Sequence, residues 1–184
     1  MLRPHVLIPP PRRKLPPPLR WLWRLWTLPT NVIGHLAGLL ASGGRLPARV
    51  RGPAASAWLY RIRPGRGLDW VGGVTLGHAI LYRPGLFDGH LGRFVLAHEL
   101  AHTRQHDWLG PLYLPLHILA QTTSALISLA SGGPAYSRVH DHNPLEQTFI
   151  CLGASAYGPL ARGEAVESHG RPIDGNALLA AFGV

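Results

Sequence analysis

A chain of 184 residues with 46% hydrophobic residues is long and apolar enough for one folded domain, and this composition excludes a disordered protein. The formal net charge of +9 comes almost wholly from arginine, since Lys14 is the only lysine. Such a charge attracts anions, including lipid headgroups, but no nucleic-acid-binding motif accompanies it. No specific nucleic acid is therefore expected as a partner. The single cysteine, Cys151, excludes an intramolecular disulfide, fits a reducing compartment and is expected in the core.

The first 45 residues divide into two parts. Residues 1–18 contain seven prolines and a basic cluster, which predicts a disordered Pro/Arg-rich arm. Residues 19–45 are apolar and rich in tryptophan and arginine, and Pro29 is expected to interrupt them. Two interpretations follow. This stretch is either an anchor at an anionic membrane surface or a pair of short helices packed on the domain.

Residues 46–184 are expected to form the domain itself. Alternating apolar side chains around Trp58 to Ile62, and again from Val74 to Tyr82, predict two or three antiparallel strands. His78 falls within the second stretch, where a hydrogen-bonded core histidine is the favoured interpretation and a metal ligand the less favoured one.

The segment HELAH, within residues 94–106, carries His98, Glu99 and His102 in the spacing of a zinc hydrolase helix. Residues four apart on a helix lie on one face, so both imidazoles can reach one zinc ion. Glu99 can then take a proton from a water molecule at the metal, as the general base of HExxH peptidases does. Apolar neighbours predict that this helix is buried, and buried histidines and carboxylates need partners that a metal supplies.

The bounds and neighbours of this metal helix are also suggested by the sequence. Asp88 is a candidate N-cap, and Gly110 with the following proline marks the end. His106 continues the histidine face but lies about 12 Å along the axis from His98, too far for the same ion. The HExxHxxGxxH class is excluded, because Gln105 stands at its glycine position and Trp108 at its third histidine. The third ligand must therefore come from elsewhere in the chain.

Residues 108–130 contain no charged side chain, which satisfies the length criterion for a transmembrane helix. Prolines near the start of this run and polar residues at 121–124 argue against a span. A buried helix packed beside the metal helix is the favoured interpretation, and a face in contact with a membrane is the alternative.

Asn143 and Pro144 predict the start of another helix, with Glu146 at its third position. Glu146 has two possible roles. It can fold back on its own helix end in a capping box, or it can supply the third zinc ligand from a helix packed against the first. Three other side chains offer alternative ligands or groups that stabilise the transition state, namely His140, His142 and Tyr136.

The runs GHAILYR, HELAHTRQHDWLGPLYLPLH and YSRVHDHNPLEQ resemble a set of small uncharacterised bacterial HExxH proteins across residues 73–157. Those proteins are similar to zinc metallopeptidases of the glutamate-zincin type, with a later Asn-Pro-x-Glu motif. The resemblance implies that His98 and His102 bind one zinc ion, that Glu99 is the catalytic base and that Glu146 is the third ligand.

A second class of peptidase uses an Asp-Gly motif for its third ligand inside the membrane, and Asp174 followed by glycine weakly resembles it. The apolar run before His98 is too short for that class, so Asp174 is expected to cap a short C-terminal helix.

We therefore expect an α+β, zincin-like domain with a small antiparallel sheet, an HExxH metal helix and two further helices. The expected activity is hydrolysis of peptide bonds in a peptide or protein substrate by a water activated at one zinc ion. The expected location is the cytoplasm or the periphery of the inner membrane. The first alternative is a membrane-associated zinc-binding or scaffolding module without catalysis, and the second is an arginine-rich surface-binding protein that holds no zinc.

Overall fold

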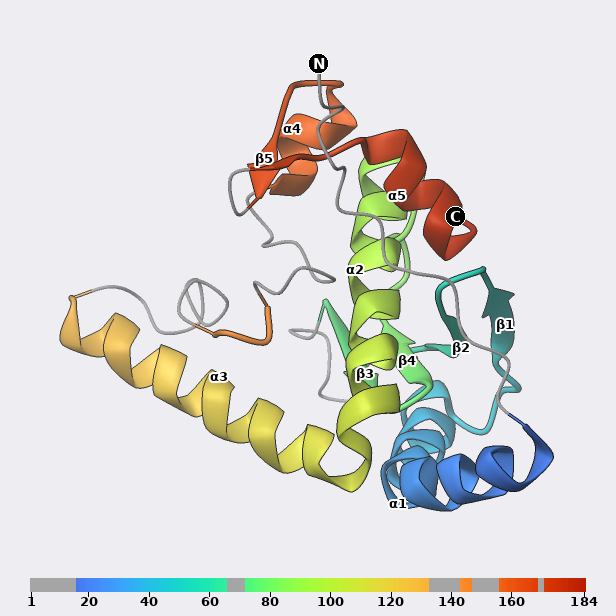
Figure 1. Cartoon of the computed structure of the whole chain (residues 1–184). Coiled ribbons are helices and arrows are strands. Elements are labelled where there is room, and N and C mark those ends of the chain that lie inside the picture. The colour runs from blue at the N-terminus through green and yellow to red at the C-terminus, as the bar shows by residue number, and fades with distance from the viewer. Residues whose placement is uncertain (1–15, 66–71, 133–142, 147–155, 169–170) are drawn as a thin grey trace.

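The structure is a computed structural model that describes residues 16–65, 72–132, 143–146, 156–168 and 171–184. Within these ranges the chain is α+β, as expected: a small four-stranded sheet is covered by helices, and a long helix runs through the centre of the molecule (Figure 1). Because both faces of the sheet are covered, most side chains of its central strands are buried or half-buried.

The sheet is mixed, so the expectation of a purely antiparallel sheet was wrong. Its spatial order is β1-β2-β4-β3, with β2 and β4 parallel and the other two pairs antiparallel. After β2 the chain passes to the far edge, forms β3 and returns as β4 between β3 and β2. The alternation from Val74 to Tyr82 is thus a hairpin, turning at Gly77 with a positive φ of 67°. The strands are β1 (Ala48–Arg51), β2 (Ser56–Arg61), β3 (Gly73–Leu76) and β4 (Ala79–Tyr82).

Helix α1 (Pro17–Ser42) covers one face of the sheet and is not interrupted at Pro29. A proline inside a helix costs about 3 kcal/mol of helix stability. Here the tertiary packing of the residues before and after Pro29 offsets that cost. Gly34 and Gly38 allow close approach, since a Cβ atom at either would collide with Leu76 or with the ring of Tyr60. The buried residues follow helical spacing along one side of α1: Thr27, Thr30, Gly34, Gly38, Ala41 and Ser42.

A hydrogen bond joins α1 to the sheet, between His35 Nδ1 and the hydroxyl of Tyr60 at 2.8 Å. Burial, and to a smaller extent the charge of His78, lowers the pKa of His35, while burial raises the pKa of Tyr60. Both shifts favour the neutral forms of this pair. Of the two interpretations of residues 19–45, packing on the domain is therefore seen, although as one helix and not as two.

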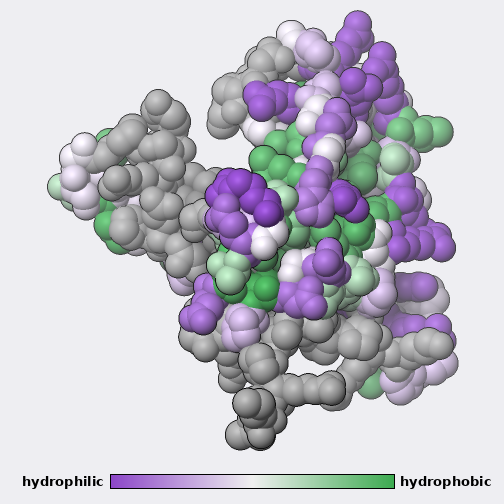
Figure 2. Space-filling model, turned by 90° about the horizontal axis from the view of Figure 1, so that it is seen from above, coloured by the Kyte–Doolittle hydropathy of each residue, from purple (hydrophilic) through white to green (hydrophobic). Residues whose placement is uncertain are grey.

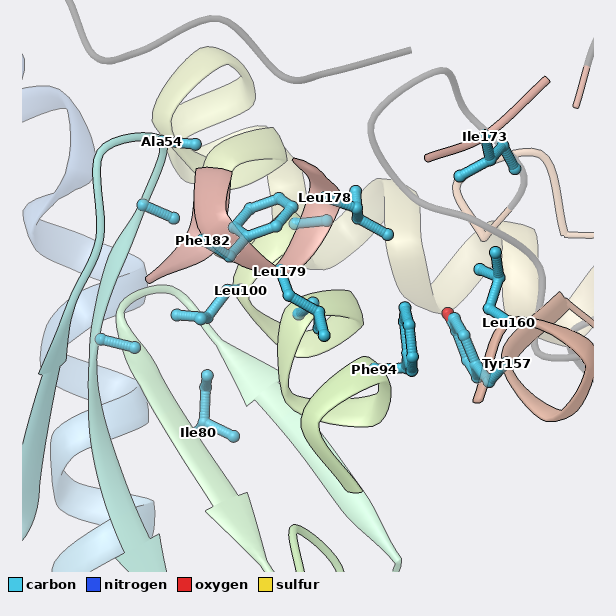
Figure 3. Close-up of a cluster of buried hydrophobic side chains, with 14 residues drawn as sticks. Ala54, Ile80, Phe94, Leu100, Tyr157, Leu160, Ile173, Leu178, Leu179 and Phe182 are labelled. Carbon is cyan, nitrogen blue, oxygen red and sulfur yellow. The ribbon is translucent and has the colours of Figure 1, made fainter. Parts of the chain in front are cut away.

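Helix α2 (Gly89–Leu109) lies on the other face of the sheet and ends at Gly110, as predicted. Asp88 occupies the N-cap position, but its side chain makes no capping hydrogen bond. Figure 3 shows Leu100 of α2, Ile80 of β4 and Phe182 gathered in the main hydrophobic core. This core holds the middle of α2, and with it the HELAH segment, against the sheet.

After the short 3-10 helix η1 (Gly110–Leu112), helix α3 (Tyr113–Ala130) points away from α2 (Figure 1). Only Tyr113, Ser124 and Ser128 of α3 are buried, so the expected burial of this apolar run beside α2 was wrong. Taken together, α2, η1 and α3 (Gly89–Ala130) include a window that is apolar and long enough to cross a membrane, and only 17% of that window is buried. By length and composition alone this is weak support for a span.

The C-terminal elements pack over the start of α2, at the top of Figure 1. Phe94 of α2 contacts this region, where Gly175 leaves room for its ring. Seen from this side in Figure 2, many hydrophilic side chains lie over a smaller hydrophobic area. The elements are α4 (Tyr157–Ala161), β5 (Glu167–Ser168), β6 (Arg171–Pro172) and α5 (Gly175–Phe182).

Candidate metal centre

Two histidines of α2 and a glutamate that is distant in the sequence converge beside the middle of α2. His98 and His102 project from successive turns of α2, and Glu146 reaches them from a separate turn of the chain. The two Nε2 atoms are 3.1 Å apart, and Glu146 Oε2 lies 3.1 Å from His98 Nε2 and 3.3 Å from His102 Nε2. His102 and Glu146 are buried, while His98 is only slightly more exposed.

These separations fit a single zinc ion. Ligand atoms about 2.0–2.1 Å from a tetrahedral zinc ion lie about 3.3 Å from one another. The three distances of 3.1, 3.1 and 3.3 Å come close to that value. Two imidazole nitrogens and one carboxylate oxygen are also a donor set that zinc accepts in catalytic sites, where a fourth position is left for water or substrate. The residues present therefore fit the metal that the HELAH segment predicts.

Gln105, one turn further along α2, sets the tautomer of His102. Its amide nitrogen donates to the backbone oxygen of Leu145 at 2.6 Å, so its Oε1 is the atom that faces His102 Nδ1 at 2.8 Å. An amide oxygen can only accept, so Nδ1 carries the proton and Nε2 presents its lone pair to the centre. Gln105 thereby connects α2 to the turn that holds Glu146.

The hydroxyl of Tyr157 in α4 hydrogen-bonds to Nδ1 of His98. When the hydroxyl oxygen accepts this bond, Nε2 of His98 is the lone-pair nitrogen, as a metal ligand requires. The rings of Tyr157 and His98 also meet edge to face, with centroids 5.3 Å apart. Each histidine thus has a partner that orients it. Neither partner was predicted, since nothing local in the sequence links Tyr157 or Gln105 to the histidines.

Glu99 is buried and faces the edge strand β3. Its Oε2 accepts a hydrogen bond of 2.6 Å from the hydroxyl of Thr75, and its Oε1 lies beside Gly73. A Cβ atom added at Gly73 would come within 2.9 Å of that oxygen. The strand therefore fixes the Glu99 carboxylate with one donor and leaves space for it at the glycine.

His117 of α3 is a further member of the centre that sequence reasoning missed. Its Nε2 lies 3.5 Å from Oε1 of Glu146, whereas His98 and His102 contact Oε2 of the same carboxylate. Its ring stacks on that of Tyr113, with centroids 5.5 Å apart, and meets His102 edge to face at 5.1 Å. The only signal in the sequence was a histidine within an uncharged helix.

Glu146 lies in a turn set by Asn143, whose Oδ1 accepts from the backbone N–H of Leu145 at 2.9 Å and whose carbonyl accepts from that of Glu146 at 3.0 Å. The Glu146 carboxylate faces the histidines and not its own turn, which favours the ligand role over the capping box. The predicted helix beyond Glu146 falls on residues 147–155, which lie outside the described residues.

The other candidates are placed as follows. Asp174 caps α5 by accepting from the N–H of Ala177 at 3.0 Å, and it belongs to neither group of possible metal ligands found among the described residues. His106 does not join His98 and His102, as expected from its distance along the helix, and faces His78 with ring centroids 5.3 Å apart. Three site candidates lie outside the described residues, namely Tyr136, His140 and His142, as does Cys151, which was expected in the core.

Comparison of the chain with protein-family models, with curated proteins and with solved structures finds no match.

Proposed function

We propose that this chain is a zinc-dependent peptidase of zincin-like architecture, with His98, His102 and Glu146 as the ligands of one zinc ion. The observation that carries the proposal is the convergence of these side chains to mutual distances of 3.1–3.3 Å. A further buried carboxylate of α2, Glu99, is held by the edge strand β3. Zinc held by two histidines and a carboxylate is a Lewis acid that polarises a carbonyl and lowers the pKa of bound water to about 7.

The chain's own residues supply the proton transfers of this hydrolysis. Thr75 engages Oε2 of Glu99, so Oε1 is the oxygen that accepts the proton of the attacking water. The hydroxide adds to the scissile carbonyl carbon, and Glu99 returns the proton to the amide nitrogen as the C–N bond breaks. His117, beside the outer oxygen of Glu146, is positioned to hydrogen-bond that carboxylate and keep it oriented.

The substrate is proposed to bind as an extended peptide along β3. This strand pairs with β4 on one side only, and no other strand among the described residues pairs with its outer edge. An unpaired edge offers backbone N–H and C=O groups to an added strand, a common way of binding extended peptides. Because Thr75 of β3 also holds Glu99, a peptide on this edge would bring its backbone close to the base.

Cleavage of an unstructured protein such as casein by the zinc-loaded chain tests this proposal. The parent is expected to cleave it, and Glu99→Gln is expected to bind zinc equally well but to lose most turnover, because an amide cannot accept the proton. Glu164→Gln is the matched control, since Glu164 is an exposed carboxylate paired with Arg162. Equal cleavage by Glu99→Gln and parent would exclude Glu99 as the base. If the parent binds zinc without cleaving, the non-catalytic zinc-binding module is favoured instead.

We further propose that the protein attaches to the surface of an anionic membrane, at the inner membrane. Apolar residues on the outer side of α1 are largely exposed, with Trp21, Leu22 and Leu25 at 65%, 62% and 63%. Arg20 and Arg24 lie on the same helix among them. Tryptophan, leucine and arginine on one exposed helix are typical of binding in the headgroup region. Helix α3 also exposes many leucines, and both helices lie on the lower side of the molecule in Figure 1.

A further inference from the structure

A second group of metal-ligating side chains lies at the C-terminal end of α2. His106 and Asp107 belong to the last turns of α2, and His78 comes from the turn between β3 and β4. One potential ligand atom from each lies within 4.8 Å of the other two, and all three residues are buried. This group is separate from the His98, His102 and Glu146 centre and has no part in the proposed hydrolysis.

Asn31 of α1 fixes the orientation of His78. Its side-chain oxygen accepts from the backbone N–H of His78 at 2.8 Å and lies 3.0 Å from Nδ1 of the same residue. Gly77 makes this approach possible, since a Cβ atom there would lie 2.5 Å from Asn31 Oδ1. Because that oxygen can only accept, Nδ1 of His78 carries a proton, and Nε2 of the neutral ring presents its lone pair.

The lone pair of His78 faces a carboxylate oxygen. His78 Nε2 lies 2.9 Å from Asp107 Oδ1, and two such acceptors come this close only with a proton or a cation between them. The ring of His106 stands edge to face with His78, at a centroid distance of 5.3 Å, and adds a second imidazole. Two imidazoles and one carboxylate are again a zinc donor set.

The surroundings of this group enclose it. Trp23 of α1 packs edge to face on His78 at 5.7 Å, and Tyr113 packs on His106 at 5.6 Å. Arg104 lies 3.7 Å from Oδ2 of Asp107, the oxygen that does not face His78, so Oδ1 is left to the group. Low exposure and apolar rings around a set of ligands make an ion bound there slow to exchange with solvent.

We infer that His78, His106 and Asp107 bind a second divalent transition-metal ion, of the zinc class, with a structural role. The midpoint of His98 and His102 lies about 10 Å along the helix axis from that of His106 and Asp107. Ions that act together in catalysis lie only about 3.5–4 Å apart. The second ion would instead join the hairpin turn at His78 to the last turns of α2. Through Asn31 it would also hold α1 in place on the sheet.

Zinc stoichiometry of the full chain, measured by elemental analysis after removal of metal and reconstitution with zinc alone, tests this inference. The parent is expected to hold about two ions, and Asp107→Asn or His78→Gln about one. Asn31→Leu is expected to weaken this site about 10- to 100-fold, because the imidazole loses its orienting acceptor. His90→Asn is the matched control, since His90 is an exposed histidine of the same helix. Circular dichroism verifies that each variant is folded.

Substitution at the first centre separates this inference from the proposed function. With Glu146→Gln, zinc bound at His78, His106 and Asp107 should remain, so about one ion should be retained. Cobalt substituted into Glu146→Gln should give the visible absorption of a four-coordinate ion. This measurement reports on the second site without any substitution of His78, His106 or Asp107. A parent that holds one ion, lost in Asp107→Asn but kept in Glu146→Gln, would contradict the first centre alone. A Glu146→Gln protein that binds no zinc, or an Asp107→Asn protein that still binds two ions, would overturn the inference. In that case the contact between His78 and Asp107 is an imidazolium-carboxylate ion pair.

Discussion

Oε1 of Gln105 lies 2.8 Å from Nδ1 of His102, and the same amide donates to the backbone oxygen that precedes Glu146. One side chain thus orients one candidate ligand and tethers the turn that carries another. A ligand histidine that is oriented in this way loses less freedom when the metal binds, so the partner contributes to metal affinity without touching the metal.

Gln105→Leu is therefore expected to weaken zinc binding about 10- to 100-fold, since both hydrogen bonds are lost. Competition with a chromophoric chelator measures this change. Gln121→Leu, the same substitution on α3, serves as the control and should leave the affinity unchanged. Equal affinity of Gln105→Leu and parent would show that Gln105 only fills space beside the helix.

Glu146→Gln tests the third ligand. An amide oxygen is a much poorer zinc ligand than a carboxylate, so zinc affinity should fall by several kcal/mol and a chelator should remove the metal from this centre. Loss of a capping contact alone would cost only about 1 kcal/mol of the free energy of unfolding. Zinc affinity is measured by chelator competition, and stability by thermal unfolding.

Two controls accompany Glu146→Gln. Asp174→Asn removes the cap of α5 and should leave zinc binding at the first centre intact. The double variant His140→Ala with His142→Ala should do the same if Glu146 is the third ligand. Tight zinc binding by Glu146→Gln, with only a small fall in melting temperature, would direct the search for the third ligand to those two histidines.

The parts of this centre that could be predicted from sequence are those whose residues lie close together in the chain. His98, Glu99 and His102 share one helix, so the helical repeat alone brings the two imidazoles to one face. Glu146 lies 44 positions after His102, and its Asn-Pro helix start left the ligand and capping roles both open. A resemblance then suggested that it joins the two histidines. Gln105 and Tyr157 act through tertiary contacts, for which no spacing rule exists.

The same distinction explains the fold. The strands follow from the alternation of apolar and polar side chains, which is a local signal. The bounds of α2 follow from two other local signals, Asp88 at its start and Gly110 at its end. The parallel pairing of β2 with β4 depends on the chain placing β3 at the edge, which no local pattern specifies. The helix through Pro29 is continuous because Gly34, Gly38 and the threonines before them pack on neighbouring elements, and this tertiary packing outweighs the local preference.

Gly73→Ala tests the placement of the proposed base. The added methyl group would lie 2.9 Å from Oε1 of Glu99, and the carboxylate must move to avoid it. A displacement of about 1 Å can lower turnover about 100-fold, while zinc affinity should stay close to that of the parent. Gly72→Ala is the matched control, because its methyl group would meet only Leu86 at an ordinary 3.9 Å. If both variants cleave casein as fast as the parent, the position of Glu99 beside Gly73 has no bearing on catalysis.

The combined substitution of Trp21, Leu22 and Leu25 by serine tests membrane attachment. Each of these side chains is more than half exposed, so the fold and zinc binding should be retained. Binding to vesicles of anionic lipid should weaken at least about tenfold, since three large apolar groups no longer enter the headgroup region. Sedimentation with vesicles gives the partition coefficient. The control is the double variant Leu46→Ser with Leu91→Ser, at exposed sites outside α1 and α3. If the control weakens vesicle binding as much as the triple variant does, α1 is not the attachment surface.

The central claim is that one zinc ion sits between His98, His102 and Glu146. Anomalous diffraction recorded on both sides of the zinc absorption edge, from crystals of the zinc-reconstituted full chain, locates the metal directly. We predict an anomalous peak about 2 Å from Nε2 of both histidines and from a carboxylate oxygen of Glu146. A map with no peak there, and with His98 and His102 instead hydrogen-bonded to each other or to water, would contradict the account.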